Sequence, residues 1–132
     1  MELEFKPPKG TDRLLFGTPR TEIRAIALRG TNFRTPPSDP ENDMYEGEGL
    51  ILGYDDKDEL EFVEVVMPST CHFSGISLIG RPLTDVIQDM RQRGYISHIE
   101  DDSHKFDELG IILFCPEGRI GSASIFKEGY YD

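Results

Sequence analysis

Two neighbouring residues in this sequence have the side-chain types of a catalytic pair. Cys71 is followed by His72, and a thiol beside an imidazole is used in nucleophilic catalysis. On an extended segment, however, adjacent side chains point to opposite faces, so these two cannot form a dyad with each other. We therefore expect Cys71 and Cys115, which both lie in or beside apolar stretches, to be buried, reduced thiols. Two cysteines do not make a disulfide framework.

A second group, formed by His98, Glu100 and His104, has ligand types that suit a divalent metal. On a strand, His98 and Glu100 would share a face, and His104 could fold back across the following loop. The run from Glu100 to Lys105 is nevertheless typical of a solvated acidic loop, and the matching segment 38–43 contains no histidine. We predict no metal site here. A metal-dependent enzyme or sensor that uses these three residues is the alternative function.

Other motifs for chemistry are missing. The acidic run from Asp55 to Glu59 lacks the alternate oxygen ligands, central glycine and terminal glutamate spacing of an EF-hand loop, and it indicates a charged hairpin tip. The sequence contains no Ser-His-Asp order, P-loop, dinucleotide fingerprint or Cys-x-x-Cys pair. We predict that the chain is not an enzyme, has no catalytic residues and binds no cofactor.

The composition is acidic. The 132 residues include 25 Asp and Glu but 14 Lys and Arg, which gives a formal net charge of −11 at pH 7. A field of this sign repels phosphate backbones and attracts basic proteins. The first eight residues have no apolar region typical of a secretory signal, and no apolar run approaches the ~18 residues of a membrane span. We expect a cytoplasmic protein that binds neither nucleic acid nor membranes.

The chain also repeats itself. Segment 15–23 matches segment 78–86 in its Leu, Gly, Pro and Thr positions, and segment 49–52 matches segment 110–113. Matches in the same order indicate a duplicated unit of about 60 residues. We predict a single domain over residues 1–132, with repeat one at about 12–70 and repeat two at about 73–132.

Each repeat predicts a short helix followed by antiparallel strands. Pro19 and Pro82 suit a first helical turn, and apolar residues follow at helical spacing. Turn residues at 55–58 and 116–119 separate β-rich runs and predict two hairpins. We further expect short strands at 32–35, 73–78 and 95–99. The predicted fold class is α+β, with two tandem helix-plus-antiparallel-strand repeats that form one sheet with the helices on one face.

The two helix starts, Gly17 to Ile23 and Gly80 to Val86, resemble the tandem repeat of β-lactamase inhibitory proteins, and also the single-unit small lipoproteins of outer-membrane assembly. This resemblance covers about half of the chain and implies a concave sheet that grips a partner protein. The chain departs from the pattern because its cysteines do not form the expected pairs within each repeat. In size and charge, it is also similar to the immunity proteins that bacteria pair with their toxins.

These observations predict a non-catalytic acidic protein-binding module. Its function would be that of an inhibitor or immunity protein that occludes a basic partner such as a nuclease toxin, acting as a monomer or weak homodimer. A scaffold subunit of a larger complex is a further alternative. Acidic side chains with tyrosines beside them are typical of protein interfaces. The predicted partner-binding residues are Asp39, Glu41, Asp43, Tyr45, Glu46, Glu48, Tyr54, Asp55, Asp56, Asp58, Glu100, Asp101, Asp102, Asp107, Glu108, Tyr130, Tyr131 and Asp132.

Overall fold

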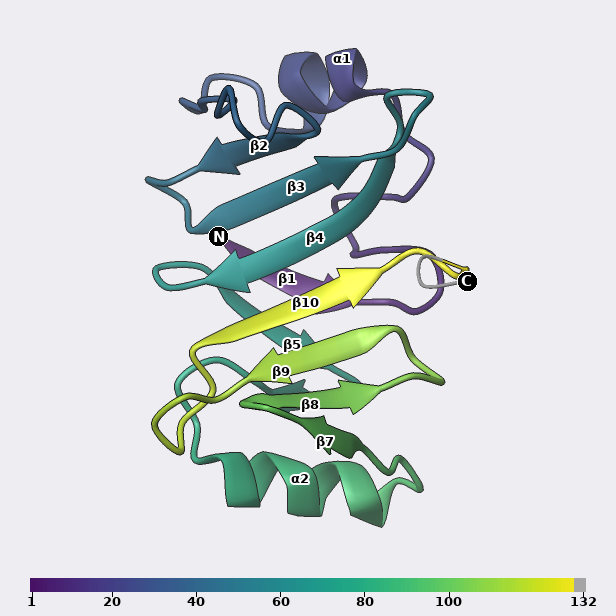
Figure 1. The fold of residues 1–132 in the computed structure, drawn as a ribbon, viewed down its shortest axis with the longest axis vertical. Helices are drawn as coiled ribbons and strands as arrows, with labels where there is room; N and C mark the ends of the chain where they lie inside the picture. Colours follow the sequence, from purple (N-terminus) through teal and green to yellow (C-terminus); the bar gives the residue numbers. More distant parts are fainter. Residues whose placement is uncertain (130–132) are drawn as a thin grey trace.

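The computed structural model describes residues 1–129 and is mostly β-structure, with 39% of the chain in strands and 14% in helices. Seven strands form an antiparallel sheet in the order β2-β3-β4-β10-β9-β8-β7 (Figure 1). Its strands are β2 (Asn42–Tyr45), β3 (Leu50–Tyr54), β4 (Leu60–Val66), β7 (His98–Glu100), β8 (Ser103–Phe106), β9 (Ile111–Phe114) and β10 (Ser122–Phe126). A second sheet has the order β1-β5-β6. It consists of β1 (Glu2–Phe5), β5 (Thr70–Phe73) and β6 (Ile76–Ser77).

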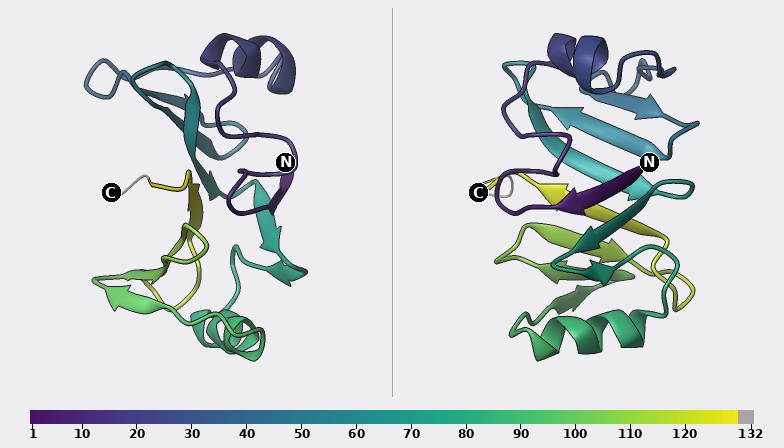
Figure 2. Two further views of the ribbon diagram at one scale, coloured as in Figure 1. Left: turned by 90° about the vertical axis from the view of Figure 1, so that its right-hand side faces the viewer. Right: turned by 180° about the vertical axis from the view of Figure 1, so that it is seen from behind.

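The small sheet packs behind the middle of the large one (Figure 2). Strands β1 and β5 pair in parallel, and this pairing holds the N-terminal residues 2–5 against residues 70–73 from the middle of the sequence. Leu3, Phe5 and Cys71 of this layer belong to one hydrophobic core with Val65 and Leu113 of the large sheet. The large sheet is curved, and its two ends bend toward the face away from the small sheet.

The predicted fold class was wrong. The helices do not cover one face of the sheet; instead, the helical segments lie at opposite ends of the molecule, and a second β-sheet forms the middle of the back layer (Figures 1 and 2). Residues 2–5 and 70–73, which are far apart in the sequence, supply this layer by pairing with each other. Neither segment has a local pattern that identifies its partner, so periodicity could not reveal the second sheet.

The two predicted helices differ in outcome. Helix α2 (Leu83–Gln92) forms as expected, with Val86 and Met90 buried on its apolar face. In the first helical segment only three residues, α1 (Arg20–Glu22), are α-helical, and the chain continues as the π-helical turn η1 (Ile23–Ala27). Ile23 is buried but Ile26 is 70% exposed, so the apolar stripe predicted from their spacing does not exist.

Among the predicted strands, the two hairpins β3–β4 and β9–β10 are confirmed. The expected strand at 32–35 is reduced to a single bridge between Arg34 and Met44. The expected strand at 73–78 is split, because Ser74 and Gly75 both have positive φ and turn the chain back on itself as β5 and β6. The strand expected at 95–99 begins later, at His98.

Corresponding positions in the two halves make corresponding backbone hydrogen bonds. The amide of Gly17 donates to Leu60 O, and the amide of Gly80 donates to Ile120 O. Likewise, Val66 N donates to Gly49 O, as Phe126 N does to Gly110 O. Strands β4 and β10 then pair along the centre of the sheet, from Ser122 with Val66 to Phe126 with Phe62. The duplication itself stays a prediction, but the two halves meet at this pair of strands.

Position 49 requires a glycine because the backbone of a neighbouring strand lies very close to it. Its φ is +75°, and a Cβ atom added there would lie 2.2 Å from the carbonyl oxygen of Val66. Gly17 has a similar φ of +87°, but a Cβ atom there would meet nothing within 4 Å. The two glycines therefore separate the cost of a left-handed backbone from the cost of a steric clash.

We expect Gly17→Ala to lower the free energy of unfolding by about 1–2 kcal/mol, the cost of a left-handed backbone with a Cβ atom. Gly49→Ala should lose a further ~1–3 kcal/mol, because strand β4 must move to accommodate the methyl group. Urea denaturation monitored by circular dichroism measures both. Equal losses in the two variants would contradict the close approach at Gly49.

Candidate functional site

No described helix or strand lies over the face of the large sheet that points away from β1, β5 and β6 (Figure 2). We call it the open face. Its residues follow from the strand register, because residues directly opposite each other on neighbouring strands share a face. One row of directly opposite residues crosses four neighbouring strands and is buried in the core: Leu52, Val63, Ile125 and Ile111. The residues that alternate with them therefore face outward.

The outward side chains form rows that cross the sheet. The central row is Met44, Ile51, Glu64, Ser124, Ile112, Lys105 and His98. On one side of this row the rings of Phe62 and Phe126 lie 5.0 Å apart, and on the other side Val66 and Phe114 flank Ser122. The Phe114 side chain is 43% exposed. The middle of the open face is therefore largely apolar, with Glu64 as its central charge.

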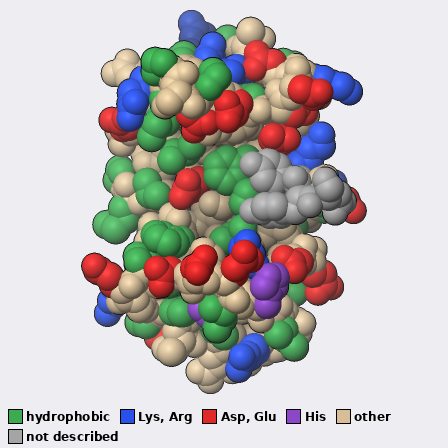
Figure 3. All heavy atoms as spheres, in the orientation of Figure 1, with side chains coloured by type: hydrophobic (Ala, Val, Ile, Leu, Met, Phe, Trp, Pro, Cys, Tyr) green, Lys and Arg blue, Asp and Glu red, His purple; other side chains and the backbone are tan. Residues whose placement is uncertain are grey.

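Acidic residues lie at both edges of this face. Strands β2 and β7 are the two outermost strands of the sheet, and each predicted acidic loop adjoins one of them. Glu46 and Glu48 follow β2, while Asp101 and Asp102 form the turn after β7. In the space-filling view, acidic side chains gather toward the upper and lower parts of the face, with hydrophobic side chains between them (Figure 3). The loops thus flank a shared surface.

Several of the predicted acidic residues pair within the chain. Arg34 donates to Glu46, Lys105 contacts Glu100 at 2.8 Å, and His98 Nδ1 lies 3.2 Å from Asp107. The acidic side chains that remain without an ion-pair partner among residues 1–129 include Asp39, Glu41, Glu48, Asp101, Asp102 and Glu108. These are the predicted residues best placed to meet a cation from outside.

The hairpin tip between β3 and β4 has mainly structural roles. Asp55 Oδ1 accepts hydrogen bonds from the backbone amides of Lys57 and Glu59, which closes the turn. Asp58 has a φ of +61° and pairs with Arg20 at 3.2 Å. Asp56 is exposed, and its side chain forms no hydrogen bond or ion pair among the described residues. Of the three predicted binding residues here, Asp56 alone has its whole carboxylate available.

Three of the predicted partner-binding residues are instead part of the interior. Asp43, Tyr45 and Tyr54 all lie on the core side of the sheet and are at most 2% exposed. The sequence places Asp43 and Tyr45 beside exposed acids, but strand alternation turns both inward. Tyr130, Tyr131 and Asp132 lie outside the residues that the structure describes.

Asp43 is the centre of a buried cluster of charges. Its carboxylate accepts hydrogen bonds from Arg20 Nη2 at 2.6 Å, from Arg24 Nη2 at 2.8 Å and from Thr35 Oγ1 at 2.7 Å. Burial raises the pKa of Asp43, but the three donors, led by Arg24, outweigh it and hold the pKa at about 2. The carboxylate is therefore ionised in the folded protein at neutral pH.

Aromatic rings complete this cluster. The Arg20 guanidinium lies 4.7 Å from the Tyr54 ring centroid, and Arg24 lies 4.5 Å from that of Phe33. The hydroxyls of Tyr45 and Tyr54 are buried without a hydrogen-bond partner in the described part of the chain. Burial raises the pKa of both hydroxyls, and that of Tyr45 to about 12. Sequence reasoning missed Arg20 and Arg24, because arginines on a short helix are normally expected in solvent.

The residues of the alternative metal site do not converge. His98 and Glu100 share a face of β7, as expected, but His104 is paired with Ile99, whose side chain points to the opposite face. His104 Nδ1 lies 3.5 Å from Ser97 Oγ, and burial lowers its pKa. Residues 1–129 contain no group of three His, Cys, Asp or Glu side chains that could hold a metal ion.

The two cysteines are free and buried. Burial raises the pKa of the Cys71 thiol to about 12 and that of Cys115 to about 11, so neither is a thiolate at neutral pH. Cys71 is 1% exposed, whereas His72, the next residue on β5, is partly exposed on the other face. This arrangement agrees with the expectation that the two residues do not form a dyad.

Comparison of the chain with protein-family models, with curated proteins and with solved structures finds no significant match. Within the described residues, no helix is long and apolar enough to cross a membrane.

The Asp43 cluster predicts a specific pH dependence of stability. The pKa of Asp43 is lower in the folded protein than in the unfolded chain, so the carboxylate stabilises the fold above about pH 4. This contribution, roughly 2 kcal/mol, should be lost as the pH falls from about 4 to 2. Asp43→Asn should cost about 3 kcal/mol at pH 7, because it leaves two arginines without their carboxylate. Urea denaturation between pH 2 and 7 measures both effects.

Asp56→Asn is the matched control, since Asp56 is exposed. The free energy of unfolding of Asp56→Asn should equal that of the original protein at every pH. In contrast, the difference in free energy of unfolding between the original protein and Asp43→Asn should become smaller in acid. If the difference in free energy of unfolding between Asp43→Asn and the original protein stays constant from pH 2 to 7, the low pKa of Asp43 is refuted.

Proposed function

We propose that this chain is a non-catalytic protein-binding module and that a basic protein occupies its open face. The observation that carries this proposal is the apolar centre of the face between two acidic edges. Stable protein interfaces combine a desolvated apolar core with a polar rim. Ile51, Ile112 and Phe114 would supply the core, and the acidic loops beside β2 and β7 would supply the rim.

Electrostatics favours a basic partner. The chain carries a net charge of −11, and Glu41, Glu48, Asp101 and Asp102 have no internal cation partner among the described residues. Carboxylates placed at the rim of an interface accelerate the approach of a positively charged protein and pair with its Lys and Arg side chains. Glu64, at the centre of the face, would require a cation or a hydrogen-bond donor opposite it.

The specific form of the proposal is an inhibitor or an immunity protein. Enzymes that act on nucleic acids use basic surfaces to bind phosphates, so an acidic protein seated on such a surface would occlude the substrate. A nuclease toxin is therefore the kind of partner that fits best.

The partner can be sought by immobilising the full chain, passing lysate of the source cell over it and eluting with a salt gradient. The proposal requires a basic protein that is held in a fixed ratio and elutes as salt rises. Binding must also depend on the open face, so the retained protein is then measured against the variants below. Retention of no such protein would leave the net charge with a solubilising role only and would reject the proposal.

Phe114→Ala should weaken binding of the captured partner at least about tenfold, because it removes an exposed aromatic side chain from the apolar centre. Ile26→Ala is the control: Ile26 is also exposed, but it lies on η1 away from the open face. Calorimetric titration gives both affinities. Equal affinities for Phe114→Ala and the original protein would place the binding surface elsewhere.

Neutralising Asp101 and Asp102 together, by Asp101→Asn and Asp102→Asn, should slow association and flatten its dependence on salt. Asn is chosen because it tolerates the positive φ of Asp101. The pair Glu22→Gln and Asp85→Asn changes the net charge equally, at helices away from the open face. Stopped-flow kinetics at several ionic strengths distinguishes them; the same salt dependence in both double variants would show that only net charge matters.

A further inference from the structure

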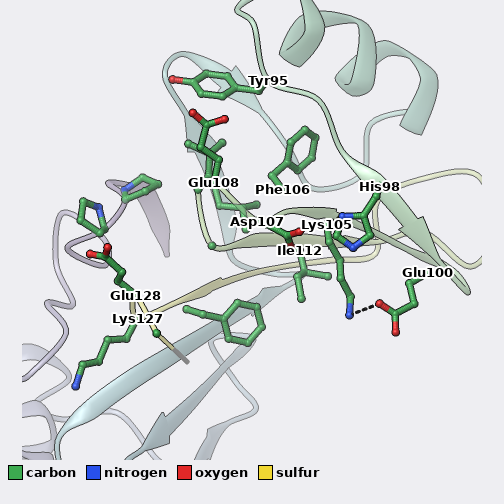
Figure 4. Close-up of a pocket in the computed structure, with 17 residues that line it drawn as sticks. Tyr95, His98, Glu100, Lys105, Phe106, Asp107, Glu108, Ile112, Lys127 and Glu128 are labelled. Carbon is green, nitrogen blue, oxygen red and sulfur yellow. Dashed lines mark ion pairs between the residues drawn. The ribbon is translucent and has the colours of Figure 1, made fainter. Parts of the chain in front are cut away.

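A pocket of about 710 Å³ opens beside the turn between β8 and β9, next to the end of β10. Segments 105–112 and 126–129 form two of its walls, and Pro7, Pro8 and Tyr95 close it from the N-terminal side and from the loop after α2. Ile112 and Lys105, which belong to the central row of the open face, also line it (Figure 4). The pocket is therefore continuous with the open face.

The pocket contains more carboxylates than its own cations neutralise. Both lysines on its wall lie against acidic side chains: Lys105 Nζ is 2.8 Å from Glu100, and Lys127 Nζ is 3.7 Å from Asp55. The imidazole of His98 lies 3.2 Å from Asp107. Glu108 and Glu128 line the same pocket and have no cation partner among residues 1–129. The pocket thus has two carboxylates whose charge a ligand could neutralise.

An aromatic ring, that of Tyr95, lines the same pocket as these carboxylates. The carboxylate of Glu108 points toward the ring of Tyr95, although the two residues come from different turns of the chain (Figure 4). The ring of Tyr95 packs edge-on against Phe73 at 5.4 Å, and its backbone amide donates to Met90 O at 3.0 Å. Tyr95 is therefore held in place before any ligand arrives. A fixed aromatic ring that shares a pocket with an unpaired carboxylate favours a planar cation.

We propose that this pocket receives an arginine side chain of the basic partner and so anchors that partner on the open face. This inference rests on the proposed function. The guanidinium would stack on Tyr95 and form charge-assisted hydrogen bonds with Glu108, while Glu128 adds negative potential from the opposite turn. Lysine is a poorer fit, because its compact ammonium group neither stacks on the ring nor bridges a carboxylate through two parallel hydrogen bonds.

The pocket can be tested without the partner. Backbone amide resonances of the full chain are followed by NMR during titration with N-acetyl-arginine amide, N-acetyl-lysine amide and N-acetyl-citrulline amide. We expect saturable shifts at Tyr95, Glu108 and Leu109 in the millimolar range with the arginine compound, and at least about fivefold weaker binding of the other two. Equal shifts with the uncharged citrulline compound would overturn the cation pocket, and equal binding of the lysine compound would overturn the choice of arginine.

Variants then connect the pocket with the partner. Glu108→Gln and Tyr95→Leu should each weaken partner binding about tenfold, whereas Tyr95→Phe, which keeps the ring and its contact with Phe73, should bind as the original protein does. Glu117→Gln makes the same charge change as Glu108→Gln, in an exposed turn outside the pocket. Unchanged partner affinity in Glu108→Gln and Tyr95→Leu would overturn the anchor.

The two proposals fail in different ways. If the partner is lost in Phe114→Ala but not in the pocket variants, the open face binds a protein and the pocket does not anchor it. If no basic partner is retained at all, the proposed function fails and the anchor fails with it, while the arginine titration separately decides whether the pocket binds a guanidinium. A loss of binding in Glu117→Gln equal to that in Glu108→Gln would attribute the effect to net charge and overturn the anchor.

Discussion

The pairing of β4 with β10 is the constraint on which the rest of this structure depends. It joins a three-stranded unit, β2 to β4, to a four-stranded unit, β7 to β10, in one continuous sheet. Because the two units meet through their inner strands, their acidic loops are carried to opposite edges, and the outward side chains of β4 and β10 become the centre of a single face. A shift of this pairing by one residue would turn Val63 and Val65 outward and Phe62 and Glu64 into the core, so the register also determines which face is buried.

At one end of the molecule, the Asp43 cluster attaches the first helical segment to the large sheet. The first helical segment is too short to be held by an apolar stripe, since Ile23 is the only one of its described apolar residues that is buried. Its attachment to the sheet relies instead on Arg20 and Arg24, which both contact the carboxylate of Asp43 on β2. Breaking a buried ion pair by removing one partner is strongly destabilising even where the intact pair contributes little net stability. The cluster therefore gives this end a specific geometry: arginines that would otherwise add positive charge at an acidic edge are directed inward.

Local patterns predicted the local parts of the fold. Turn residues at 55–58 and 116–119 located both long hairpins, and the spacing of Val86 and Met90 located helix α2. Such patterns could not predict the pairing of strands that lie far apart in the sequence. The parallel pairing of residues 2–5 with residues 70–73 has no sequence signal, and it places a second sheet behind the middle of the large one, where helices were predicted. The burial of two predicted site residues escaped the sequence for a related reason. Asp43 and Tyr45 share an acidic segment with Glu46 and Glu48, but only strand alternation, which requires the boundaries of β2, separates the inward residues from the outward ones.

This distinction changes what the acidity of the chain means. Composition alone describes a uniform negative charge, whereas the structure divides the carboxylates into those satisfied internally, such as Asp43, Asp55 and Asp58, and those without a cation, such as Glu48, Asp101 and Glu108. Only the second group can gain free energy from a partner's cation, since a carboxylate that is already paired would have to give up an existing contact. The unpaired group borders an apolar face at both edges and one pocket at its side. A partner able to satisfy both surfaces at once must therefore present basic side chains around an apolar centre, and this requirement is far more selective than net charge.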